Sequence, residues 1–253
     1  CLSAGFVLYF LSKKAEYKVR LLYKEEIRTC GKDAKNIVSL GTAGFVMQLT
    51  NSLVSICCNN VLSATGGDVY VSVMTIISSV RQMIETPIWS ISEGSSPVIS
   101  YNYGAKRPKK VIEAWITMSV LALIYSLIAW SVILFAPKFL IGIFSSDKSL
   151  MIDTVPAMKL YFSAFIFMLF QYTGQTMFKS LNKKKQAIFF SILRKVIIVV
   201  PMTYMFPYVF HMGSNGVFMA EPVSNVIGGS LCFIVMLLTV LPELKQMNSD
   251  LSS

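Results

Sequence analysis

The chain has 253 residues, of which 54% are hydrophobic and only 14% are charged. In soluble globular domains about a quarter of the residues are charged, so this composition excludes an ordinary water-soluble domain and indicates a membrane protein. The formal net charge of +10 does not indicate a nucleic-acid partner, because the Lys and Arg residues lie in short loops between apolar blocks and form no continuous basic face.

The first residues predict the end of a membrane helix. Residues 1–11 (CLSAGFVLYFL) are apolar, but a spanning helix needs ~20 residues. They lack the basic n-region and the small-residue cleavage site of a signal peptide. We therefore expect the end of a truncated transmembrane helix at 1–11, with a preceding six-helix half of the same chain outside this sequence. Residues 12–36 are predicted to form a basic cytoplasmic linker.

Six apolar segments follow, each long enough to span a bilayer. They lie at 37–62, 69–100, 112–136, 155–179, 186–210 and 216–241. Lys and Arg concentrate in alternate loops, as the positive-inside rule requires. The alternation predicts an all-α, six-helix transmembrane lobe at 37–241 of a multi-pass membrane protein, with the linker, the two basic loops and a C-terminal tail at 242–253 in the cytoplasm.

The second segment carries charges in its interior. Arg81 and Glu85 share an arc of roughly 80° on a helical wheel with four other side chains, Ser78, Trp89, Ser92 and Ser96. An ionisable group in hydrocarbon costs ~2.5–3.5 kcal/mol, so the pair should face a water-filled cavity or each other. We interpret Glu85 and Arg81 as ion-coupling candidates, with a static ion pair as the alternative. Candidates for a substrate cavity on this segment are Ser78, Gln82 and Trp89.

Two other segments carry polar stripes. The first segment holds Gln48, Asn51, Ser55 and Asn59 on one face, and the fourth holds Gln171 and Gln175 among aromatic and Met residues. Such stripes either bond to neighbouring helices or line a cavity. Amide, Met and aromatic groups suit flat, lipophilic, often cationic ligands. All six residues are therefore further candidates for the substrate cavity.

Prolines and the remaining charges complete the pattern. Each proline in a helix removes an intrahelical hydrogen bond, so we expect hinges at Pro87, Pro97, Pro201 and Pro207. Glu221 is expected at the outer interface, and Arg194 is expected to extend its side chain to the headgroups from near a helix end. Five cysteines without C-x-x-C spacing and one histidine give no metal-site pattern.

Residues 94–106 (GSSPVISYNYGAK) resemble the helix-end motif of the multidrug and toxic compound extrusion (MATE) family. Other stretches agree with the family in order and spacing: 135–147, 171–179, Arg194 with Pro201 and Pro207, and Gly216 with Pro222. The resemblance covers essentially the whole chain. It implies the C-terminal lobe of a twelve-helix antiporter in the cell membrane, which exports small organic, often cationic, compounds in exchange for H+ or Na+ and needs no cofactor.

The resemblance also implies acidic coupling residues on the first and fourth segments of this lobe. Here the first segment has no acidic residue, and the fourth offers Gln171 and Gln175. Coupling is therefore expected at Glu85 or at a carboxylate of the N-terminal half.

The alternative function is a flippase for lipid-linked saccharides or peptidoglycan precursors from the same superfamily. Such flippases carry more basic side chains in the cavity, whereas only Arg81 is expected in the middle of the membrane. An enzyme is not indicated, because the sequence has no H-E-x-x-H or G-x-S-x-G motif and no phosphate-cradling loop.

Overall fold

The computed structural model describes Tyr9 and residues 31–145 and 147–250. The chain divides into two compact units, Cys1–Phe45 and Val46–Ser253, and apart from the start of α3 the features below lie in the second. The predicted truncated helix at 1–11, apart from Tyr9, and the predicted linker up to residue 30 lie outside the described residues.

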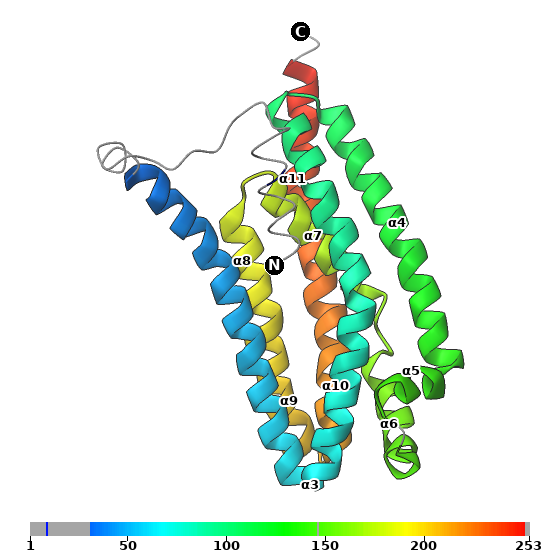
Figure 1. The fold of residues 1–253 in the computed structure, drawn as a ribbon. Coiled ribbons are helices and arrows are strands. Elements are labelled where there is room, and N and C mark those ends of the chain that lie inside the picture. Colours follow the sequence, from blue (N-terminus) through cyan, green and yellow to red (C-terminus); the bar gives the residue numbers. More distant parts are fainter. Residues whose placement is uncertain (1–8, 10–30, 146, 251–253) are drawn as a thin grey trace. The chain divides into compact units, whose positions relative to one another are not determined.

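The described residues form helices and no strands (Figure 1). Two of the segments, η1 and η2, have π-helical hydrogen bonding. In chain order the elements are α3 (Gly31–Gly104), α4 (Pro108–Phe135), α5 (Pro137–Phe144), α6 (Lys148–Tyr161), α7 (Phe167–Ser180), α8 (Lys184–Ile192), η1 (Leu193–Val199), α9 (Val200–Tyr208), α10 (Ser214–Ser224), η2 (Asn225–Gly229) and α11 (Ser230–Asp250).

Helix α3 contains the first two predicted segments, joined by one sharp turn at Gly67. This residue has φ 69° and ψ −169°, a conformation that only glycine adopts at little cost. The chain reverses there without a separate loop, so the two arms of α3 rise from a common end in Figure 1. Pro87 and Pro97 lie inside the second arm, which stays helical through both.

The predicted segment at 155–179 is interrupted, because residues 162–166 separate α6 from α7. The backbone there makes hydrogen bonds to the residue three positions earlier instead of four, for example from Phe165 N to Phe162 O at 3.1 Å. The indole of Trp130 on α4 donates to Phe162 O at 3.0 Å, and the Phe162 ring stacks edge-on with Tyr161 and Phe165. The hydrogen bond from Trp130 to the Phe162 carbonyl and the aromatic cluster thus stabilise the interruption between α6 and α7.

The last two crossings are each interrupted by a π-helical segment, η1 between α8 and α9 and η2 between α10 and α11. The turn between α9 and α10 uses positive φ angles at His211 and Gly213. The two helices then pack closely, because a Cβ at Gly216 would lie 2.8 Å from the carbonyl carbon of Phe206. Helix α11 continues to Asp250, so the described part of the predicted tail, 242–250, is helical.

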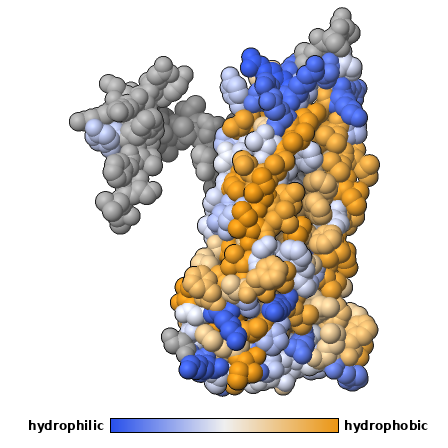
Figure 2. All heavy atoms as spheres, turned by 90° about the vertical axis from the view of Figure 1, so that its right-hand side faces the viewer, coloured by the Kyte–Doolittle hydropathy of each residue, from blue (hydrophilic) through white to orange (hydrophobic). Residues whose placement is uncertain are grey.

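Helices long and apolar enough to cross a membrane occur at four places in the described chain, Gln48–Gly104, Pro108–Phe135, Lys184–Tyr208 and Ser214–Ser249. The first contains both arms of α3, and the interrupted pair α6 and α7 supplies the remaining crossing. The predicted all-α membrane lobe of about six crossings is therefore confirmed in outline. Figure 2 shows apolar side chains over the middle of one face and hydrophilic ones concentrated at its ends.

Asp147 begins α6 in the connection outside the membrane helices. Its carboxylate accepts a hydrogen bond from Ser149 N at 2.8 Å and another from the Ser149 hydroxyl. These bonds stabilise the charged form and hold the pKa of Asp147 below its ordinary value. Asp147 is therefore an N-cap in its ionised state.

Candidate functional site

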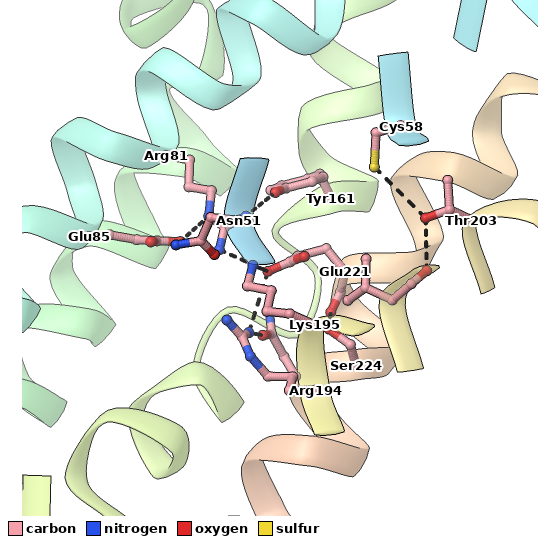
Figure 3. Close-up of polar contacts among 12 residues, drawn as sticks. Asn51, Cys58, Arg81, Glu85, Tyr161, Arg194, Lys195, Thr203, Glu221 and Ser224 are labelled. Atoms are coloured by element: carbon pink, nitrogen blue, oxygen red, sulfur yellow. Dashed lines mark hydrogen bonds and ion pairs between the residues drawn. The ribbon is translucent and has the colours of Figure 1, made fainter. Parts of the chain in front are cut away.

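Five charged side chains from three elements meet inside the bundle (Figure 3). Arg81 and Glu85 come from the second arm of α3, Arg194 and Lys195 from η1, and Glu221 from α10. The side chains of Glu221, Arg194 and Lys195 are 6–9% exposed, whereas those of Arg81 and Glu85 are 19% and 17% exposed. The cluster therefore has a buried interior and an accessible edge at Arg81 and Glu85.

Arg81 connects three helices through its guanidinium group. Its Nε pairs with Glu85 Oε1 one turn along α3. Its Nη2 lies 2.9 Å from Glu221 Oε1 on α10, and its Nη1 donates to the Tyr161 hydroxyl of α6 at 2.6 Å. The second oxygen of Glu85 accepts a bond from the Tyr172 hydroxyl of α7 at 3.3 Å. One arginine therefore shares two carboxylates and ties α3 to α6 and α10.

Two further basic side chains, both from η1, also contact Glu221. Its Oε1 atom lies 3.4 Å from Arg194 Nη1 and 3.3 Å from Lys195 Nζ. Arg194 also donates to Asn225 Oδ1 on η2. Buried charges of this kind persist only where partners and hydrogen bonds compensate their lost hydration. Glu221 is thus the central anion of the cluster.

The π-helical segments explain how neighbouring residues reach the same atom. In a regular α-helix, adjacent side chains diverge by about 100°, yet Arg194 and Lys195 both contact Glu221 Oε1. The wider π turn of η1 changes this angular spacing, and such turns are frequent at functional sites. On η2, Gly228 leaves room for Arg194, because a Cβ there would lie 2.8 Å from Arg194 Cγ.

A smaller set of uncharged contacts supports the cluster from α9 and the first arm of α3. The Thr203 hydroxyl donates to Val199 O at 2.8 Å, and the buried Cys58 thiol lies 3.8 Å from that hydroxyl. The Ser224 hydroxyl donates to Glu221 O at 2.8 Å. These contacts fix the backbones of η1 and α10, from which the charged side chains project.

Three sequence predictions are wrong at this site. The side chains of Glu221 and Arg194 do not point out to the headgroups, because both are buried inside the bundle and paired with each other. Arg81 is also not alone as a basic residue in the interior, since Arg194 and Lys195 join it. The adjacent Arg-Lys pair inside an otherwise apolar segment was a usable signal, because two neighbouring cations rarely lie in a span without a partner.

The predicted cavity residues fall into three groups. The polar stripe of the first arm, with the Asn51 amide 3.4 Å from Gln48 Oε1, is exposed, as are the residues flanking the cluster on the second arm. The amides of Gln171 and Gln175 are buried and donate to Phe190 O and Ala187 O of α8, at 3.5 and 3.2 Å. Their part in a substrate cavity stays a prediction. The exposed candidates are Gln48, Asn51, Ser55, Asn59, Ser78, Gln82 and Trp89.

Two other members of the predicted polar arc lie elsewhere. Ser92 is fully buried, and its hydroxyl has no hydrogen-bond partner among the described residues. The Ser96 hydroxyl lies 2.8 Å from that of Ser180 on α7, which links the two helices. The arc therefore changes from a charged site to a packing surface along α3.

Two of the four predicted proline hinges lie beside an irregular crossing, and two lie in a regular helix. Pro201 and Pro207 belong to α9, directly after η1, whereas Pro87 and Pro97 lie within the continuous second arm of α3. Hinge motion at these prolines stays a prediction. Over the part of the chain that the structure describes, no three His, Cys, Asp or Glu residues are grouped as metal ligands.

Comparison with known families decides the classification. The family model described as MatE matches residues 44–205, which include Arg81, Glu85, Arg194 and Lys195. The chain belongs to the MatE family. This confirms the resemblance of the sequence to MATE proteins and the prediction that the chain is a transporter component and not an enzyme.

Solved MATE structures share the fold of this MatE chain. A MATE in complex with MaL6 matches with a TM-score of 0.82 at 19% identity, over 98% of this chain and 55% of that one. A MOP-superfamily transporter from Pyrococcus furiosus, described as having a binding pocket of reversed polarity, gives 0.83 at 19% identity, over 98% and 54%. An outward-facing multidrug resistance MATE transporter gives 0.79 at 19% identity, also over 98% and 54%.

The chain therefore spans about half the length of these structures. A search of curated proteins by sequence finds no match.

Proposed function

We propose that this MatE chain is the C-terminal lobe of a secondary antiporter that exports small lipophilic organic compounds, many of them cationic, from the cell in exchange for H+ or Na+. In this proposal the transporter lies in the plasma membrane with its C-terminus in the cytoplasm. A preceding six-helix half of the same chain completes the substrate cavity.

The observation that supports this proposal best is the position of the Glu85 carboxylate. It is half-buried in a membrane helix, and it shares Arg81 with the fully buried Glu221. An ionisable group at such a depth marks an ion pathway by default. Glu85 is the more accessible of the two carboxylates, so it is the one that can exchange a proton or Na+.

The geometry supports a coupling step. When Glu85 takes up a proton, its ion pair with Arg81 weakens, and Arg81 is then held mainly by Glu221 and Tyr161 on α10 and α6. The second arm of α3 thereby changes its attachment to those helices. A ligand that binds one arrangement better than the other shifts the population between them, which is the requirement for alternating access.

The full-length protein in liposomes tests this proposal. We expect export of a cationic dye that is driven by an imposed pH gradient or by an imposed Na+ gradient, and the two arms identify the coupling ion. The Glu85→Gln variant should reduce gradient-driven export to the level of protein-free liposomes, because an amide can exchange neither ion.

The matched control is Glu113→Gln. Glu113 pairs only with Lys110 on the exposed start of α4, with both side chains more than half exposed, so export should stay at the wild-type rate. Wild-type export by the Glu85→Gln variant under both gradients would remove Glu85 from the coupling step.

The second candidate is a flippase for lipid-linked saccharide pyrophosphates. The sequence predicts only one basic residue in the interior, whereas the structure has three: Arg81, Arg194 and Lys195. Two carboxylates engage these cations, which leaves less charge for a pyrophosphate than a dedicated site needs. Gradient-independent scrambling of a fluorescent polyprenyl pyrophosphate by the same liposomes, without dye export, would favour the flippase.

A further inference from the structure

The buried cluster carries more positive than negative charge. Arg81, Arg194 and Lys195 face Glu85 and Glu221, so the formal charge is +1. The two guanidinium groups stay protonated at any physiological pH. A net charge in the membrane interior is costly unless a counter-charge lies beside it. With Lys195 charged, one more negative charge beside the cluster would balance it.

The neighbouring elements provide no such charge among the described residues. Tyr161 on α6 and Tyr172 on α7 present hydroxyl groups, and Asn225 on η2 presents an amide oxygen. The three basic groups share only the two carboxylates in their ion pairs. A bound anion would supply the counter-charge that these described residues do not.

The accessible edge shows where an anion enters. The side chains of Arg81 and Glu85 are 19% and 17% exposed, against 6–9% for the three interior residues. The polar side chains of Ser78 and Gln82 next to them are exposed as well. A small anion can therefore approach the Arg81 guanidinium from this side, whereas Lys195 and Arg194 lie behind Glu221.

We infer that the Arg81 edge of the cluster binds a small monovalent anion, such as chloride or a carboxylate, together with the coupling proton. A proton on Glu85 raises the charge of the cluster by one unit, so the anion binds more strongly to the protonated lobe. Proton and anion together then enter the membrane with less net charge than the proton alone. The protonation of Glu85 rests on the proposed function; the anion site itself does not.

The test measures the thermal unfolding of the full-length protein in detergent, in sodium chloride, sodium acetate and sodium gluconate at equal ionic strength. No transported compound is present, so an acid group of a substrate cannot be the occupant. We expect a saturable rise in melting temperature with chloride or acetate over the larger gluconate, since a ligand that binds only the folded state stabilises it.

Three variants should respond to chloride in three different ways. Lys195→Gln makes the cluster formally neutral and should abolish the chloride effect. Glu85→Gln mimics the protonated state and should lower the half-saturating chloride concentration about tenfold, the size of one charge interaction at a partly buried site. The control Lys179→Gln removes a cation that pairs with Glu93 outside the cluster and should leave the chloride effect unchanged.

The outcomes separate this inference from the proposed function. Equal stability in all three salts would overturn the anion site. The excess positive charge would then be removed by loss of a proton from Lys195. An unchanged chloride effect in Lys195→Gln, or a weaker one in Glu85→Gln, would overturn it too. Chloride dependence with the expected variant pattern, but without gradient-driven export, would support the site while contradicting the antiport.

Discussion

At the scale of single residues, Glu221 determines the stability of the charged interior. One carboxylate oxygen, Oε1, is within 3.4 Å of nitrogen atoms of Arg81, Arg194 and Lys195. Removing one member of a buried ion pair costs about 3–5 kcal/mol, because the partner stays buried without compensation. Here the loss would leave three cations with Glu85 alone.

We therefore expect Glu221→Gln to lower the free energy of unfolding by about 3–5 kcal/mol or to prevent folding. Thermal unfolding of the purified full-length protein measures the effect. The matched control is Glu93→Gln, since Glu93 pairs with Lys179 at a site about one third exposed, where an ion pair contributes about 0–1 kcal/mol. Equal melting temperatures for the two variants would show that Glu221 is not the central anion.

At the scale of elements, the irregular crossings bring the charged residues together. The interface between η2 and α7 is especially close, because a Cβ at Gly229 would lie 2.5 Å from Phe167 O. Small residues at membrane helix interfaces permit such approach of two backbones. The position of α10, and with it Glu221, depends on this contact through the continuous helix of α10, η2 and α11.

Gly229→Ala should consequently destabilise the protein by about 1–3 kcal/mol, the usual cost of overpacking, and should lower gradient-driven export. The control is Gly142→Ala in α5, where a Cβ would meet only Met151 Cε at 3.9 Å, an ordinary contact. Melting temperature and export rate are measured for both variants. A fully active, equally stable Gly229→Ala protein would contradict the close packing of η2 on α7.

At the scale of the whole molecule, the loops determine the orientation in the membrane. Lys106 and Arg107 lie in the turn between α3 and α4 and Lys109 and Lys110 in the first turn of α4, whereas the turn between α9 and α10 has no Lys or Arg. The positive-inside rule therefore predicts that the α3–α4 turn lies in the cytoplasm and the α9–α10 turn outside.

Labelling with a membrane-impermeant maleimide tests this orientation. In right-side-out vesicles, Asn215→Cys should be labelled directly, and Lys109→Cys only after permeabilisation. The unsubstituted protein gives the background from its own cysteines. Both substituted positions are exposed, so lack of access does not limit either reaction. Labelling in the opposite order would invert the proposed topology.

Composition and local pattern are enough to predict the membrane class, the approximate positions of the crossings and the Arg81–Glu85 pair. Each of these follows from composition, from the length of apolar segments or from neighbours four residues apart on a helix. Such signals are local, so they can be recognised in the sequence without knowledge of how the helices pack.

Only the tertiary structure decided that Glu221 is buried, that Arg194 and Lys195 contact it, and that residues 162–166 leave the helix. Each of these features depends on partners distant in the sequence: Arg81 for Glu221, and the Trp130 indole for the Phe162 carbonyl. The π turn of η1 further changes the angular spacing on which a helical wheel relies. The site therefore arises from packing, which no local pattern specifies.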